Sequence, residues 1–171
     1  MGMRTKLLLK HANLSIILLI MGFWAIKNTP GQQDKSFRQE LAKEDTIIAY
    51  KKGKVSKLLS DSKCFKELKD EIENFVANIN DTYRFIPSEA GFNKLKKKGF
   101  AIELVFSSPK ELKIDFLASP IIISKIFIPL SDGNFPSACV FIYEVHKDLP
   151  RVFANTKQNK IKLLELVKGL D

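Results

Sequence analysis

Apolar residues recur at three- and four-residue steps between positions 62 and 79, and this period predicts an amphipathic helix. The apolar positions are Phe65, Leu68, Ile72, Phe75, Val76 and Ile79. Asp61 or Ser62 stands where it can cap the start of this helix. Lys69 and Glu73 are opposite charges four residues apart, a spacing that supports a helix along its exposed face.

Two other segments have helical spacing. Residues 86–99 predict a shorter helix, with Ser88 as a candidate cap. Residues 159–170 predict a final helix, with Asn155 or Thr156 as its candidate cap.

From residue 100 onward the apolar period changes to two, which is the pattern of half-buried strands. Strands are expected over 100–107, 111–115, 121–128, 138–145 and 151–156. The segment 45–59 is ambiguous, because it fits a strand that turns at Lys52 and Gly53 and fits a helix nearly as well. Both interpretations of this segment stay open.

The short links between these strands favour a meander of about four antiparallel neighbours. One amphipathic helix precedes the strands and another follows them, and we expect both to cover one face of the sheet. The expected fold class is therefore α+β: a two-layer domain over residues 45–171 that follows an N-terminal membrane helix. A chain of 171 residues suits one such domain with appendages.

The most hydrophobic stretch of the chain lies within residues 1–27. Its apolar positions include Leu14, Ile16, Ile17, Leu18, Leu19, Ile20, Phe23 and Trp24. Arg4, Lys6 and Lys10 precede it, and a basic segment followed by an apolar one is the order of a signal sequence. The upstream charges also predict a cytoplasmic N-terminus. We therefore expect residues 1–27 to form a signal-anchor and the polar residues 28–44 to form a juxtamembrane linker.

Whether this segment is cleaved after export stays open. Cleavage sites need small residues, and a cut after Ala25 would put Phe23 three residues before it, so a retained anchor is preferred. The uncharged run Leu14–Ile26 reaches only about 20 Å as a helix, less than the roughly 30 Å hydrocarbon core. However, the flanking Lys10 and Lys27 can extend toward the headgroups. We expect a single-pass membrane protein with its domain outside, and a protein secreted after cleavage is the alternative.

The charge of the chain bears on its partners. The net charge is +9, and four of the 28 Lys and Arg lie in residues 1–27, so the rest keeps 24 basic side chains against 19 acidic ones. That excess is smaller than in a dedicated nucleic-acid-binding domain, and an exported domain would not meet nucleic acid. We therefore expect no nucleic-acid partner. A basic and an apolar segment before one soluble domain are typical of a bacterial exported protein.

Two lysine runs are the most conspicuous surface chemistry. They consist of Lys51, Lys52, Lys54 and Lys57, and of Lys94, Lys96, Lys97 and Lys98. One interpretation is attraction to anionic lipid headgroups or to an anionic envelope polymer. It predicts that both runs form one continuous patch and that binding weakens with salt. The other is a solvated surface, in which the second run suits the C-terminal dipole of its helix.

Groups with catalytic or ligating chemistry are sparse. Cys64 and Cys139 either form one disulfide or remain two unpaired small residues. Together with His146 they give no metal-ligand spacing, and the isolated glycines give no phosphate loop, so no metal or other cofactor is expected. Glu103 and Glu144 lie in expected strands, where they either converge on one sheet face for acid–base work or point to solvent.

These features favour a non-enzymatic, membrane-anchored extracytoplasmic domain that binds or assists other components of the cell envelope. The partners then expected are the membrane itself and a protein of an envelope complex. Two alternatives remain. One is a binder of anionic polymer or lipid, and the other is a small exported hydrolase that uses a carboxylate. An enzyme is the less favoured class, because no reactive constellation stands out.

Overall fold

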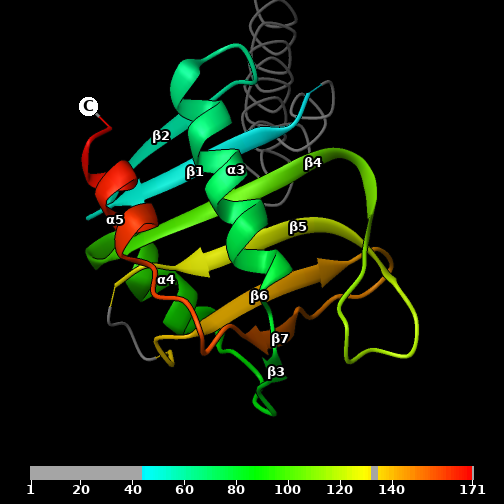
Figure 1. Ribbon diagram of the computed structural model, residues 1–171. Coiled ribbons are helices and arrows are strands. Elements are labelled where there is room, and N and C mark those ends of the chain that lie inside the picture. The colour runs from blue at the N-terminus through cyan, green and yellow to red at the C-terminus, as the bar shows by residue number, and fades with distance from the viewer. Residues whose placement is uncertain (1–43, 132–134, 171) are drawn as a thin grey trace, which may run out of the picture. The chain divides into compact units, whose positions relative to one another are not determined.

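The computed structural model describes residues 44–131 and 135–170, which belong to one compact α+β unit (Figure 1). In chain order, its elements are β1 (Thr46–Lys51), β2 (Lys54–Leu58), α3 (Lys63–Ala77), β3 (Asp81–Thr82), α4 (Glu89–Lys98), β4 (Phe100–Leu112), β5 (Ile121–Pro129), β6 (Cys139–Glu144), β7 (Arg151–Ala154) and α5 (Ile161–Lys168). The expected signal-anchor and linker lie outside the described residues. Within the described ranges, no helix has the length and apolar character needed to cross a bilayer.

The sheet has seven antiparallel strands in the order β2-β1-β4-β5-β6-β7-β3. The meander expected from the sequence is confirmed, since β4, β5, β6 and β7 are consecutive neighbours. The ambiguous segment 45–59 is the β1–β2 hairpin, not a helix. Its turn has Lys52 at φ 49° and Gly53 at φ 88°, and glycine adopts that left-handed conformation without a steric penalty.

Helices cover both faces of the sheet. α3 and α5 lie on one face, as expected, and their apolar side chains share a core with Ile102, Ile126 and Ile142. α4 lies on the opposite face, so the expectation of a simple two-layer domain is incomplete (Figure 1). Strand β6 shows that both faces of the sheet are covered. Its successive residues Phe141 and Ile142 point to opposite faces, and both are buried.

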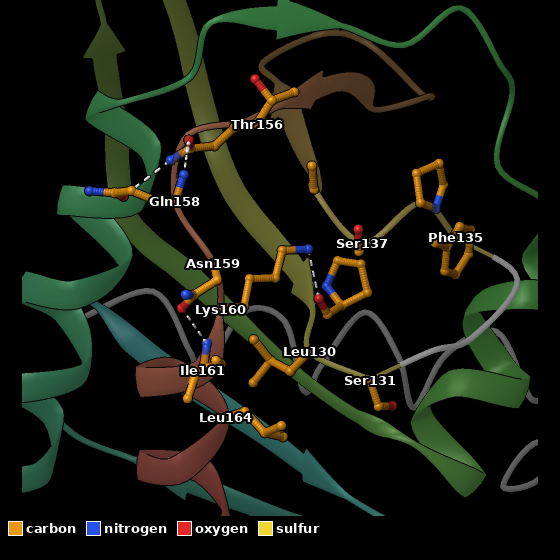
Figure 2. Close-up of a pocket in the computed structure, with 14 residues that line it drawn as sticks. Leu130, Ser131, Phe135, Ser137, Thr156, Gln158, Asn159, Lys160, Ile161 and Leu164 are labelled. Carbon is orange, nitrogen blue, oxygen red and sulfur yellow. Dashed lines mark hydrogen bonds between the residues drawn. The ribbon is translucent and has the colours of Figure 1, made fainter.

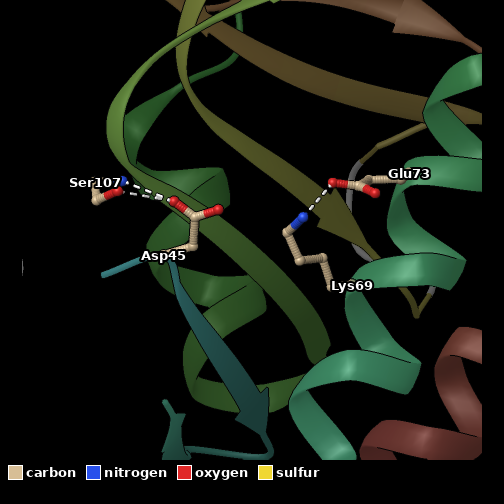
Figure 3. A network of polar contacts seen from close by, with 4 residues as sticks. All are labelled: Asp45, Lys69, Glu73 and Ser107. Atoms are coloured by element: carbon tan, nitrogen blue, oxygen red, sulfur yellow. Dashed lines mark hydrogen bonds and ion pairs between the residues drawn. The ribbon is translucent and has the colours of Figure 1, made fainter. Parts of the chain in front are cut away.

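Polar contacts stabilise helix α3 and join the start of β1 to its neighbouring strand (Figure 3). Ser62 caps α3 by accepting a hydrogen bond from the amide of Phe65 at 3.1 Å, which confirms one of the two candidate caps. Lys69 and Glu73 form the expected ion pair at 2.6 Å. Asp45 accepts hydrogen bonds from the amide and hydroxyl of Ser107 at 3.0 and 3.1 Å. These two bonds fasten the beginning of β1 to β4.

Two element boundaries differ from the sequence-based expectation. The strands expected over 100–107 and 111–115 form one strand, β4, whose pairing with β5 shifts register between Val105 and Lys110. Lys160, not Asn155 or Thr156, occupies the N-cap position of α5, and its side chain makes no capping bond. The fully buried Asn155 instead donates to the carbonyl of Phe75 at 2.8 Å, which ties the end of α3 to this loop.

The two cysteines are both free: Cys64 is exposed at the start of α3, and Cys139 is buried in β6. Burial raises the pKa of the Cys139 thiol to about 11, although nearby Lys160 partly opposes this. We therefore expect one thiol of the native full chain to react with a maleimide at mildly alkaline pH, and two in denaturant. Mass spectrometry checks this, and a Cys64→Ser control should leave the native protein unlabelled. A native Cys64→Ser protein that still gains one label would contradict the assignment.

Candidate functional site

The β1–β2 turn rests on the C-terminal end of α4. The amide of Lys52 donates to the carbonyl of Gly99 at 2.7 Å, and the amide of Gly53 donates to the carbonyl of Lys96 at 3.2 Å. A Cβ at Gly53 would lie 3.1 Å from the carbonyl oxygen of Lys97, so glycine also permits this close approach. Parts of the two lysine runs, which are separated by 36 residues between Lys57 and Lys94, therefore meet at one end of the sheet.

The C-terminal end of α5 joins the same surface. Lys51 donates to the carbonyls of Lys168 and Leu170 at 2.7 and 2.8 Å. The ammonium groups of Lys52 and Lys168 lie 5.8 and 5.9 Å from the ring centre of Phe100. Lys168 was absent from the sequence-based candidates because it belongs to neither run. A lysine in the last turn of a predicted helix was the only signal available.

We call this surface the lysine-rich end. Its exposed members are Lys52, Lys54, Lys94, Lys97, Lys98 and Lys168. Residues 46–58 and 90–100, which supply five of these lysines, contain no Asp or Glu. Lys97 and Lys98 follow Lys94 by three and four positions, so both lie beside it on the surface of α4. In Figure 1 the lysine-rich end is on the left, where the arrowhead of β1 and helix α5 lie.

Not every lysine of the two runs belongs to this end. Lys51 caps α5, as described above, and Lys57 lies further along β2. Lys96 points inward, where its ammonium lies 3.7 Å from Glu103 and 4.6 Å from the ring centre of Tyr50. The two runs thus supply exposed positive charge at the β1–β2 turn and on one face of α4. Lys51 and Lys96 instead make contacts that stabilise the fold.

Glu103 is the centre of a buried polar cluster on the face covered by α4. Its carboxylate accepts a hydrogen bond from the hydroxyl of Tyr50 at 2.8 Å. It also forms ion pairs with Lys125 at 2.8 Å and with Lys96 at 3.7 Å. Only 5% of the residue is exposed. The interpretation that Glu103 points to solvent is therefore wrong, because α4 covers this part of the sheet.

The electrostatics of the cluster keep Glu103 ionised. Burial alone would raise its pKa, but the charges of Lys125 and Lys96, with the hydrogen bonds from Lys125 and Tyr50, outweigh burial and lower the pKa. Burial, followed by the charge of Glu103, raises the pKa of Tyr50 well above its ordinary value. A carboxylate that is buried and neutralised in this way suits a structural role better than proton transfer to a substrate.

Glu144 lies on the opposite face of the sheet. It pairs in register with Ile123, which belongs to the core under α3, whereas Glu103 pairs with Phe127 on the α4 face. The two carboxylates therefore do not converge. Glu144 is 2.7 Å from Lys147, and its other oxygen is 3.1 Å from Nε of Arg151 without hydrogen-bond alignment, so that contact is ionic.

Glu144 also lines a surface pocket of about 500 Å³, together with His146 and the segment 117–122. Lys147 and Arg151 already neutralise its carboxylate. Across residues 44–131 and 135–170, no three side chains of His, Cys, Asp or Glu gather closely enough to hold a metal ion.

The fold and these contacts define an antiparallel α+β domain with one strongly basic end. Comparisons with known protein families, with characterised proteins and with solved structures find no match to the chain.

Proposed function

We propose that this protein is a membrane-anchored extracytoplasmic binding domain, non-enzymatic, whose lysine-rich end holds an anionic polymer of the cell envelope. The observation that carries this proposal is the meeting of two separate lysine runs and Lys168 at one end of the sheet.

The expected strength of the interaction follows from the charges. A lysine near an anionic surface contributes about 1 kcal/mol at moderate ionic strength. The exposed lysines sit on a hairpin and on two helices, so they are already arranged and lose little freedom on binding. Several weak charge contacts then add up to a useful affinity for a polyanion, with little chemical specificity.

Strand β1 leads from Thr46 to the lysine-rich end. The strand begins at Thr46, paired with Val105, and ends at Lys51, paired with Phe100. Six residues of strand span about 20 Å. The lysine-rich end therefore lies at the opposite end of β1 from Thr46.

The test is a binding assay on the full chain in a neutral detergent. Beads that carry poly-L-glutamate supply the polyanion, and vesicles that contain phosphatidylglycerol or only phosphatidylcholine supply the lipid surfaces. We expect binding to the polyanion whose logarithmic affinity falls linearly with the logarithm of salt concentration between about 50 and 500 mM.

Each alternative has its own outcome in this assay. Preferred binding to phosphatidylglycerol vesicles would replace the polymer by the lipid surface. Failure to bind either anionic surface at low salt would refute the proposed function and leave a protein partner as the remaining occupant. Binding that does not change with salt would show that the lysines do not carry the interaction.

A further inference from the structure

A pocket of about 280 Å³ lies beside the N-terminal end of α5 (Figure 2). Its walls come from the end of β5, from the residues before β6 and from the loop before α5. The polar lining consists of Ser131, Ser137, Asn155, Thr156, Gln158 and Asn159. Leu130, Phe135, Ile161 and Leu164 supply apolar surface. A pocket of this size suits a small molecule of a few carbon atoms.

Lys160 lines this pocket and is held in a fixed position. Its ammonium donates to the carbonyl of Pro129 at 2.8 Å and to the carbonyl of Cys139 at 2.6 Å, and Figure 2 shows the first of these bonds. Both carbonyls lie beyond the last residue pair between β5 and β6, which is Phe127 with Phe141. A protonated lysine has three N–H groups, so one remains for a ligand after these two bonds.

Lys160 has no carboxylate partner among the residues of the pocket that the structure describes. Among the described residues that line the pocket, none is acidic. Burial lowers the pKa of Lys160 to about 8, and Cys139 is the titratable group that opposes this shift. Lys160 is also the N-cap residue of α5, at the positive end of the helix dipole, which is an unfavourable position for a cationic residue. An anion in the pocket would relieve both effects.

We propose that this pocket binds a small monocarboxylate, whose carboxylate accepts a hydrogen bond from Lys160 and whose short apolar body lies against Leu130, Ile161 and Leu164. The single ammonium matches one carboxylate better than a multiply charged phosphate. This site is separate from the lysine-rich end and does not depend on the proposed function.

The probe is hexanoate, measured by titration calorimetry with the full chain in neutral detergent, and 1-hexanol is the matched ligand without the charge. We expect hexanoate to bind at least tenfold more tightly than hexanol. Lys160→Met should weaken hexanoate binding about tenfold or more, because it removes a charge-assisted hydrogen bond. The control Lys157→Met alters an exposed lysine of the same loop and should bind normally.

A second variant keeps the proposal testable if Lys160→Met fails to fold, since Lys160 also ties β5 to β6. Ser137 is exposed and lines the pocket, so Ser137→Trp should fill the pocket and abolish binding while leaving Lys160 in place. Equal affinities for hexanoate and hexanol would overturn the proposal. So would unchanged hexanoate binding in either folded variant, or the absence of hexanoate binding by the unmodified chain.

The pH dependence gives an independent readout. Binding requires the protonated amine, so the affinity for hexanoate should be constant below the pKa of Lys160 in the unliganded protein, which burial lowers to about 8. Above it, the affinity should fall by about tenfold per pH unit. An affinity that stays constant from neutral pH to about pH 10 would show that the ammonium of Lys160 does not hold the carboxylate.

Discussion

Replacement of Glu103 by alanine should lower the free energy of unfolding by about 3–5 kcal/mol, because it leaves two lysines near one another without their common carboxylate. Urea unfolding of the full chain in neutral detergent, followed by circular dichroism, measures the change. Glu111→Ala is the matched control. Glu111 is exposed and lies 3.9 Å from Lys113, which directly follows the same strand, so its loss should cost less than about 1 kcal/mol.

The pH dependence of this effect has a definite sign. The pKa of Glu103 is lower in the folded protein than its ordinary value of 4.5, so the folded state favours the ionised form. The resulting stability is fully present above the ordinary pKa and is lost as the pH falls through the lower folded value. A Glu103→Gln variant lacks this contribution. The difference in the free energy of unfolding between this variant and the unmodified chain should therefore become smaller in acid. A difference that does not change with pH would contradict the assignment.

The sequence predicted the strand that carries Glu103 but not the environment of its side chain. Alternation in β4 places the side chains of Glu103 and Leu104 on opposite faces of the sheet. In a half-buried strand, the face that carries the charged side chains normally points to water. That inference failed because α4, which precedes β4, packs on the face that was expected to be free. Which face a short helix covers depends on long-range contacts, such as Phe92 with Phe127, that no local period reports.

The elements missed or left open share a physical reason. β3 consists of two edge residues, too few to establish any period, and it exists only because β7 pairs with it. The β1–β2 hairpin lacks a clean alternation because its outer strand β2 is largely exposed. By contrast, α3 and the strands from β4 to β7 are long enough, or buried enough, for their patterns to be unambiguous.

The lysine-rich end was predictable only in part. Both runs are visible in the sequence, and a role in binding an anionic surface predicts that they form one continuous patch. Whether they would meet depended on the bonds from the β1–β2 turn to the end of α4, which join residues far apart in the chain. Parts of both runs meet at the lysine-rich end, whereas Lys51, Lys57 and Lys96 lie outside it, and binding itself stays a prediction.

Reversal of charge at the lysine-rich end should abolish most of the proposed binding. The variant changes Lys52, Lys54, Lys97 and Lys98 to glutamate. At about 1 kcal/mol for each lost lysine, and with added repulsion, the affinity for poly-L-glutamate at low salt should fall by at least about a hundredfold. All four side chains are exposed, so stability should change little, and an unfolding curve checks that the variant is folded.

The control variant must lower the net charge equally at a different surface. Lys63, Lys66, Lys110 and Lys113 are exposed, and changing them to glutamate removes the same charge from the start of α3 and the far end of β4. This variant should keep most of its affinity, since charges more than a Debye length from the bound polymer are screened. Equal losses in both variants would mean that net charge alone drives the interaction. Retained binding in the first variant would refute the role of the lysine-rich end, because four of its six exposed lysines would then carry the opposite charge.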